Sequence, residues 1–207
     1  MKSPLIIACL IAATPLFAKT ECPIFSTTKP KVLLINFDGL GASEFNIKIL
    51  EKNISQKIIR RCSSKEVHSA TFHYGKRGAL AAYQCAKKLR ESNPLLSISV
   101  FGHSFGGGKG VFNFLQNTVK ESIIDIENAV TFDPRGYSYR YQNPGNPYVD
   151  NFINIYQRKP LRGMQVKGSD FESNVTALGV THGNLPKTKG DLALKQLRGS
   201  LTCANSK

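Results

Sequence analysis

Short apolar runs alternate with amphipathic segments along most of the chain. Residues 31–37 and 95–101 are almost wholly apolar, which is the pattern of strands buried on both faces of a sheet. Apolar residues at helical spacing follow both runs. The pattern predicts strands near 31–37, 67–74, 95–101, 123–132, 151–156 and 163–168, and helices near 43–60, 76–91, 105–119 and 190–199. This alternation predicts an α/β fold with a mostly parallel central sheet flanked by helices.

The first 18 residues have the pattern of an export signal. Lys2 precedes an apolar stretch that ends near Leu16, and Ala18 precedes a polar segment. The stretch is too short for a transmembrane helix. We therefore expect residues 1–18 to be a cleaved signal peptide and residues 19–207 to form a single domain of an exported protein, either periplasmic or secreted.

Removal of this segment would leave four cysteines, namely Cys22, Cys62, Cys85 and Cys203. An even number in an exported protein favours two disulfides, and no Cys-x-x-Cys pair is present to suggest a zinc site. We therefore expect no metal. Three pairings are open from sequence, and we predict Cys62 with Cys85 and Cys22 with Cys203, which would join the chain ends.

The chain is strongly basic, with 28 Lys+Arg against 14 Asp+Glu and a net charge of +14. Such a charge attracts anionic membranes or envelope polymers. The basic residues are scattered, and no stripe of interleaved basic and aromatic residues marks a nucleic-acid reader, so we expect no specific nucleic-acid partner. We expect a monomer.

The most informative motif is Gly102-His103-Ser104-Phe105-Gly106, a G-x-S-x-G sequence between a predicted strand and a predicted helix. At such a junction the serine sits on a sharp turn that exposes its hydroxyl, and the flanking glycines let strand and helix approach. A phosphate-binding loop is excluded because Gly110 stands where that motif needs Ser or Thr. Ser104 is the predicted nucleophile.

A serine hydroxyl needs a base, and the base needs a carboxylate to orient it. Of the four histidines, His182 is predicted to lie in a glycine-flanked loop near the C-terminus, and we expect it to be the base. Asp133, at the end of the strand after the nucleophile helix, is the favoured acid. Asp170 is the main alternative and Asp150 a weaker one. We expect the side chain of His103 to point away from the nucleophile.

The oxyanion that forms during acyl transfer needs preorganised donors. We expect the main-chain N–H of Phe105 to supply one of them. The second is expected from the loop after the first strand, at Asp38 and Gly39, with the Asp38 side chain pointing away from the anion.

These residues resemble the α/β-hydrolase superfamily, in particular its small bacterial lipase-like and esterase-like branch. The similarity lies in residues 102–107, in the strand end at 130–134, and in the chain order Ser104, Asp133, His182. It also includes residues 154–157, 161–163 and 166–168, together with Asn174 and His182. It implies a single α/β-hydrolase-like domain that cleaves a carboxylic ester or related acyl bond of a small substrate through an acyl-enzyme, without a cofactor. Two alternatives stay open: thioesterase or acyltransferase chemistry, and a non-catalytic basic module that binds the cell envelope. Apart from residues 135–148, no segment is long enough to form a lid.

Overall fold

A computed structural model describes residues 22, 30–37, 39, 49–62, 66–121, 124–136, 147–158, 163–166, 168–176 and 179–205. The predicted signal peptide at 1–18, the loop residue Asp38 and most of the segment 135–148 lie outside the described residues. Across the described ranges, no helix is both long and apolar enough to span a bilayer.

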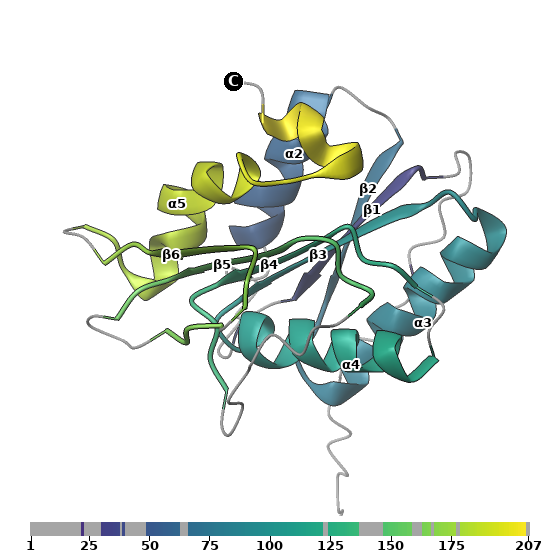
Figure 1. Ribbon diagram of the computed structural model, residues 1–207, viewed down its shortest axis with the longest axis horizontal. Coiled ribbons are helices and arrows are strands. Elements are labelled where there is room, and N and C mark those ends of the chain that lie inside the picture. Colours follow the sequence, from purple (N-terminus) through teal and green to yellow (C-terminus); the bar gives the residue numbers. More distant parts are fainter. Residues whose placement is uncertain are drawn as a thin grey trace, which may run out of the picture.

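Six strands form one sheet in the order β2-β1-β3-β4-β5-β6, and every neighbouring pair is parallel (Figure 1). The strands are β1 (Val32–Phe37), β2 (Val67–Phe72), β3 (Ser97–His103), β4 (Asn128–Phe132), β5 (Phe152–Tyr156) and β6 (Phe171–Asn174). The prediction of an α/β fold with a mostly parallel sheet is therefore confirmed.

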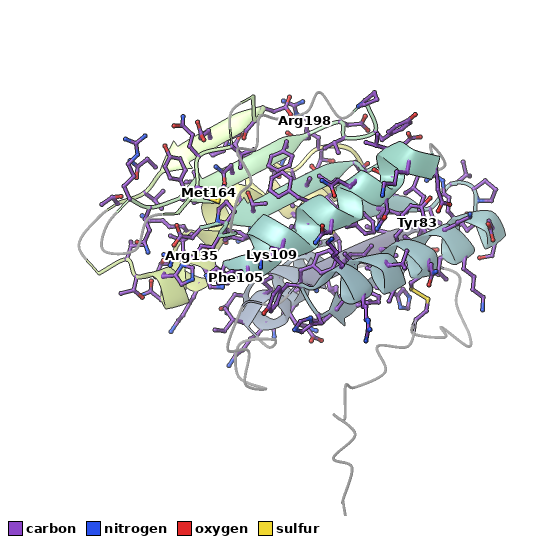
Figure 2. All side chains as sticks on the ribbon, turned by 90° about the horizontal axis from the view of Figure 1, so that it is seen from below. Tyr83, Phe105, Lys109, Arg135, Met164 and Arg198 are labelled. Atoms are coloured by element: carbon purple, nitrogen blue, oxygen red, sulfur yellow. A yellow bond between two sulfur atoms is a disulfide. The ribbon has the colours of Figure 1, made fainter. Side chains whose placement is uncertain are left out.

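Helices cover both faces of this sheet (Figure 1). One face carries α3 (Lys76–Ser92) and α4 (Phe112–Glu121), which continues a π-helical turn, η2 (Gly106–Val111). The other face carries η1 (Glu51–Ser55) with α2 (Gln56–Cys62), α5 (Leu185–Leu194) and the 3₁₀-helix η4 (Gly199–Asn205). Side chains alternate between the two cores along β1, where Leu33 and Ile35 face α3 and α4 while Leu34 faces α2. Tyr83 of α3 is among the largest fully buried side chains (Figure 2).

Two disulfides are present, but the predicted pairing is wrong. Cys22 pairs with Cys85, and Cys62 pairs with Cys203. The reason is that Cys62 ends α2 and Cys85 lies in α3, and these helices cover opposite faces of the sheet. Cys203 lies in η4, on the same face as α2, so it is the partner within reach of Cys62.

Two predicted elements near the C-terminus are also wrong. The described residues of the segment 163–168 form no strand, and the sixth strand is instead the short polar β6. Its register on β5 comes from main-chain pairing, while Glu172 accepts hydrogen bonds from the Val166 N–H and the Asn154 amide. The last α-helix begins at Leu185 rather than near 190, because Pro186 is favourable in the first turn of a helix.

Candidate active site

The strands β3 and β4 end level with each other, and this brings two predicted site residues together. In the parallel register His103 is paired with Phe132, so Ser104 and Asp133 are the next residues on neighbouring strands. The Ser104 N–H donates to the Phe132 carbonyl at 2.9 Å, and the Asp133 N–H donates to the Ile155 carbonyl at 2.7 Å. Both side chains therefore stand at the carboxyl edge of the sheet, where open α/β sheets bind their ligands.

The turn at Ser104 is strained in the way that the motif predicts. Ser104 has a φ of 57°, and the only other non-glycine residue with positive φ among those described is Asp133, at 48°. A Cβ on Gly102 would lie 2.6 Å from the Gly106 carbonyl, so only glycine permits the helix to start this close to the strand. The sharp turn leaves Ser104 at the tip, between β3 and η2.

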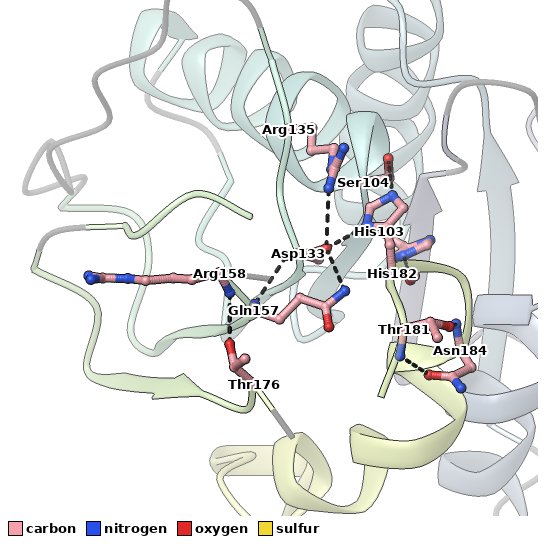
Figure 3. Close-up of polar contacts among 10 residues, drawn as sticks. All are labelled: His103, Ser104, Asp133, Arg135, Gln157, Arg158, Thr176, Thr181, His182 and Asn184. Atoms are coloured by element: carbon pink, nitrogen blue, oxygen red, sulfur yellow. Dashed lines mark hydrogen bonds and ion pairs between the residues drawn. The ribbon is translucent and has the colours of Figure 1, made fainter. Parts of the chain in front are cut away.

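The imidazole of His182 lies between the side chains of Ser104 and Asp133 and contacts both (Figure 3). Its Nε2 lies 2.8 Å from Ser104 Oγ, and its Nδ1 is hydrogen-bonded to Oδ2 of the fully buried Asp133. The carboxylate accepts from Nδ1–H, which leaves Nε2 as the acceptor for the serine hydroxyl. The structure thus brings Ser104, His182 and Asp133 into one hydrogen-bonded line, while their catalytic roles stay a prediction.

His182 begins a short 3₁₀-helix, η3 (His182–Asn184), that leads directly into α5, rather than lying in an open loop. Thr181 caps this helix: its Oγ1 accepts from the Asn184 N–H at 3.3 Å, and Asn184 Oδ1 accepts from the Thr181 N–H at 2.8 Å (Figure 3). The reciprocal cap fixes the main chain at the position that carries the imidazole.

The alternative acid Asp170 lies at the other edge of the sheet. Its Oδ2 accepts from the N–H of Phe152 at 2.7 Å, and Phe152 is the first residue of β5. Its Oδ1 lies 3.8 Å from Arg198 Nη1. Asp150 precedes β5 and is at the same amino edge. Of the three candidate carboxylates, Asp133 is therefore the one that contacts His182.

The switch point of the sheet lies beside the nucleophile. The chain passes from β1 to β2 on one side and from β3 to β4 on the other, so the order reverses between β1 and β3. Gly39, just beyond β1, is next to Ser104, since a Cβ on it would lie 3.2 Å from Ser104 Cβ. Phe105 directly follows Ser104 and begins the helical backbone at a φ of −63°. Two of the three predicted oxyanion residues thus flank Ser104, and the third, Asp38, lies outside the described residues.

Two residues that the sequence analysis did not assign hold the main chain of His182. His103 Nε2–H donates to the His182 carbonyl at 2.7 Å, and the two imidazole rings lie 4.7 Å apart between centroids. The His103 side chain thus contacts the residue that carries the base, a contact that the sequence analysis did not predict. Gln157, fully buried just after β5, contacts the other side of the same segment. The signals for Gln157 in the sequence are its place at the end of a predicted strand and its place in residues 154–157, which are part of the family resemblance.

The amide of Gln157 has two possible orientations. With its nitrogen toward the Val180 carbonyl (3.1 Å), its oxygen accepts from the His182 N–H (2.6 Å). In the orientation drawn in Figure 3, the nitrogen instead makes one long contact of 3.5 Å to Asp133 Oδ2. We adopt the first orientation because it satisfies both amide atoms. Gln157 then connects the segment that carries the imidazole to the strand end beside Asp133, whose Oδ1 accepts from the Gln157 main-chain N–H at 3.2 Å.

Comparisons with known proteins return only distant structural similarity. No protein-family model and no curated protein matches the sequence. Among solved structures, an acetylxylan esterase is 10% identical, with a TM-score of 0.49 over 80% of this chain and 96% of the other. An esterase domain from Rhodothermus marinus is 10% identical, with a TM-score of 0.42 over 72% and 77%. A thioesterase from the prodiginine pathway of Streptomyces coelicolor is 13% identical, with a TM-score of 0.34 over 64% and 52%. These similarities are too low to transfer function between chains.

The described residues offer no alternative centre for metal chemistry, because among them no three or more His, Cys, Asp or Glu side chains are grouped closely enough to hold an ion. The polar groups gathered at the carboxyl edge include a hydroxyl, two imidazoles, a carboxylate, an amide and the guanidinium of Arg135. Such a set is suited to moving a proton from a hydroxyl to an imidazole.

The buried ring of His103 makes the folded state sensitive to acid. Burial, and secondarily the neighbouring His182, lowers the pKa of His103 from 6.5 to about 4. Between these two values the unfolded chain binds a proton that the folded chain does not, so stability falls as the pH drops from 6.5 toward 4. A pKa difference of this size corresponds to about 3 kcal/mol.

Replacing His103 with Gln is expected to remove this component, because the amide can still donate to the His182 carbonyl but does not titrate. Urea unfolding at about pH 7 and about pH 4.5 would measure it. We expect the loss of unfolding free energy on acidification to be smaller in His103→Gln than in the native protein. The exposed His73 provides the control, and His73→Gln should behave as native. Equal acid sensitivity of native protein and His103→Gln would contradict this account.

Proposed function

We propose that this chain is an exported serine hydrolase that cleaves a carboxylic ester or related acyl bond through an acyl-enzyme on Ser104. One observation carries the proposal: Ser104 Oγ lies 2.8 Å from Nε2 of His182, whose Nδ1 contacts the buried carboxylate of Asp133. This order of hydroxyl, imidazole and carboxylate is the arrangement that activates a serine nucleophile. Its place on a strained strand-to-helix turn supports the same proposal.

The proposed reaction has two halves. In the first, Ser104 Oγ attacks the carbonyl carbon of the ester and its proton passes to His182 Nε2, which gives a tetrahedral oxyanion. Collapse of this intermediate expels the alcohol, which takes the proton from His182, and leaves the acyl group on Ser104. In the second half, water attacks the acyl group and gives a proton to His182 Nε2. The bond between the acyl carbon and Ser104 Oγ then breaks, Ser104 Oγ takes that proton from His182, and the carboxylic acid leaves.

The remaining groups stabilise the charges that form during the reaction and keep His182 in position. Asp133 orients the His182 ring and stabilises its protonated form. The main-chain N–H groups of Phe105 and the residues near Gly39 are the proposed donors to the oxyanion. Thr181, His103 and Gln157 keep the main chain of His182 in place.

Export of the protein is part of the proposal. The N-terminal 18 residues have the signal pattern, and the two disulfides are bonds that persist in oxidising compartments. Without residues 1–18, which contain Lys2, the exported enzyme would have a net charge of 27 − 14 = +13, and this charge would also attract it to anionic envelope surfaces.

A fluorophosphonate probe tests the proposal directly, since it reacts with activated serines. We expect one covalent adduct, located on Ser104 by peptide mass spectrometry, in the folded protein and none after denaturation in urea. His182→Ala should slow labelling by at least about a hundredfold because the base that activates the hydroxyl is gone. The exposed His73 provides the matched control, and His73→Ala should label at the native rate.

The outcomes separate the candidate functions. Labelling of Ser104 together with turnover of short 4-nitrophenyl esters supports the ester hydrolase. Labelling without ester turnover would point to thioester or acyl-transfer chemistry at the same serine. A folded protein that neither labels nor turns over any ester, yet binds anionic vesicles in low salt, would overturn the enzymatic proposal in favour of a binding module.

A further inference from the structure

Arg135 is a cation beside the candidate active site that the proposed mechanism does not use. It follows Asp133 by two residues, and its main-chain N–H donates to the Ser104 carbonyl at 2.8 Å. The same carbonyl accepts from the Gly108 N–H at 2.9 Å, so the segment that carries Arg135 lies directly against the turn at the nucleophile. Its guanidinium is beside the line of Ser104, His182 and Asp133 (Figure 3).

Among the described residues, the guanidinium has two hydrogen-bond donors without an acceptor. Nε and Nη2 are shielded from solvent, and neither has an acceptor within the part of the chain that the structure describes. Nη2 lies 3.8 Å from Asp133 Oδ2, which is beyond hydrogen-bonding distance. The Asp133 oxygens already accept from His182 Nδ1 and from the Gln157 N–H. Shielded charged donors without acceptors are costly, and an incoming acceptor would remove that cost.

The charge of the guanidinium favours an anionic acceptor. The proton that His182 gains when Ser104 attacks is matched by the oxyanion formed in the same step, so the reaction leaves the net charge of the site unchanged. Asp133, whose Oδ2 lies 3.8 Å from Arg135 Nη2, is already hydrogen-bonded to His182 through that oxygen. An anionic group placed against the guanidinium would give its shielded nitrogens both acceptors and an opposite charge.

A substrate bound at Ser104 would lie close to the guanidinium. Ser104 is 6% exposed, and Arg135 Nη2 lies 3.8 Å from the Asp133 oxygen that is hydrogen-bonded to His182. The Arg135 side chain keeps 22% of its surface exposed, so part of it is open to solvent. A substrate group that extends from the scissile bond toward Asp133 would supply the acceptor that the two nitrogens lack among the described residues.

We propose that Arg135 binds an anionic oxygen group of the substrate, so that this enzyme acts on esters that carry a carboxylate or a similar anion close to the scissile bond. The inference rests on the proposed function of Ser104. A guanidinium suits this task because its planar fork matches a carboxylate with two parallel hydrogen bonds. Lys109, whose ammonium lies 5.1 Å from the Phe105 ring, adds positive charge at the same end of the sheet (Figure 2). The net charge of 27 − 14 = +13 on the chain without residues 1–18 would attract anionic substrates.

Two pairs of matched esters test the proposal and locate the anion. The first pair carries the charge in the acyl group: the mono-4-nitrophenyl ester of adipic acid and the same compound with its free carboxylate methylated. The second carries it in the alcohol: 3-carboxyphenyl butyrate and 3-carbamoylphenyl butyrate. In the native protein we expect kcat/KM to favour the anionic member by at least about tenfold in one pair, in line with a charged hydrogen bond. The ratio should fall in about 0.5 M NaCl.

Arg135→Gln should bring the ratio close to one in the pair that showed the preference, whatever it does to the absolute rates. The matched control is Arg158→Gln, which removes the same charge from an arginine that points away from Ser104 in Figure 3 and contacts Gln165. This variant should keep the native ratio. Fluorophosphonate labelling of Ser104 in each variant reports whether the catalytic group is still assembled.

Three results would overturn the proposal. If Arg135→Gln lowers both members of a pair equally, Arg135 acts only by positioning Asp133 and His182. If native protein labels on Ser104 but shows no preference in either pair, the substrate class is wrong while the proposed function stands. If native protein neither labels nor turns over any of the four esters, the proposed function fails and the inference fails with it.

Discussion

Replacement of Ser104 with alanine is expected to lower kcat for 4-nitrophenyl butyrate by about 10⁴- to 10⁶-fold, since the nucleophile of the acyl-enzyme route is lost. The residual rate would come from the oxyanion donors and from substrate binding alone. The fold should be retained, because the alanine keeps the strained backbone of the turn and loses only one hydroxyl hydrogen bond, to His182. Steady-state kinetics and near-ultraviolet circular dichroism on the same preparation would measure both.

Ser92 provides a control for the serine-to-alanine change itself. Its hydroxyl donates to the Leu89 carbonyl at the exposed C-terminal end of α3. This end of α3 leads into the start of β3, whereas the nucleophile turn follows the end of β3. Ser92→Ala should therefore keep the native kcat. Retention of more than about a hundredth of the native rate in Ser104→Ala would show that another group performs the attack.

Asp133→Asn is expected to lower kcat by about 10³- to 10⁴-fold with little loss of structure. The asparagine has the same shape and can still accept from the Gln157 N–H through its oxygen. Its NH₂ group, however, would face His182 Nδ1, which favours the tautomer with the proton on Nε2. That nitrogen would then donate to Ser104 Oγ and could not take its proton. The loss should therefore appear in kcat more than in KM.

Asp170→Asn is the matched control, because it makes the same substitution in the alternative acid. Asp170 accepts from the Phe152 N–H at the amino edge of the sheet, and the asparagine oxygen can keep that bond. We expect kcat to stay within about threefold of native and the thermal midpoint to drop by a few degrees at most. A large loss in Asp170→Asn with little loss in Asp133→Asn would reassign the acid.

The contrast between these two aspartates shows which features of the site local sequence cannot predict. Each follows a predicted strand, Asp133 the strand near 123–132 and Asp170 the strand near 163–168. Both lie between Ser104 and His182 in the sequence, which is the position of the acid in the superfamily that the sequence resembles. Which edge each one occupies depends on strand order and register. The pairing of His103 with Phe132 puts Asp133 next to Ser104, whereas the hydrogen bond to Phe152 holds Asp170 where β5 begins. Register is a property of paired strands and is absent from either strand alone.

The residues that hold His182 illustrate the same limit. Thr181 and Asn184 form a local cap that a three-residue spacing can suggest, because both partners lie in one turn. His103 and Gln157 reach His182 from strands that are 79 and 25 positions away along the chain. No short-range pattern predicts such contacts, and the position of Gln157 at a strand end indicates only the edge on which it lies.

The amino-acid sequence by itself determined the α/β class of this protein. The spacing of apolar residues within each short segment is enough to predict whether that segment is a buried strand or an amphipathic helix, and the two alternate along the chain. It also marked the sharp turn at Ser104, since the glycines around it are needed by the turn itself. Only the tertiary structure decided which cysteines pair, which aspartate contacts His182, and that Arg135 lies beside them with donors that no described residue satisfies. Those outcomes depend on which face of the sheet each helix covers and on how the strands align, and both are set when distant segments pack together.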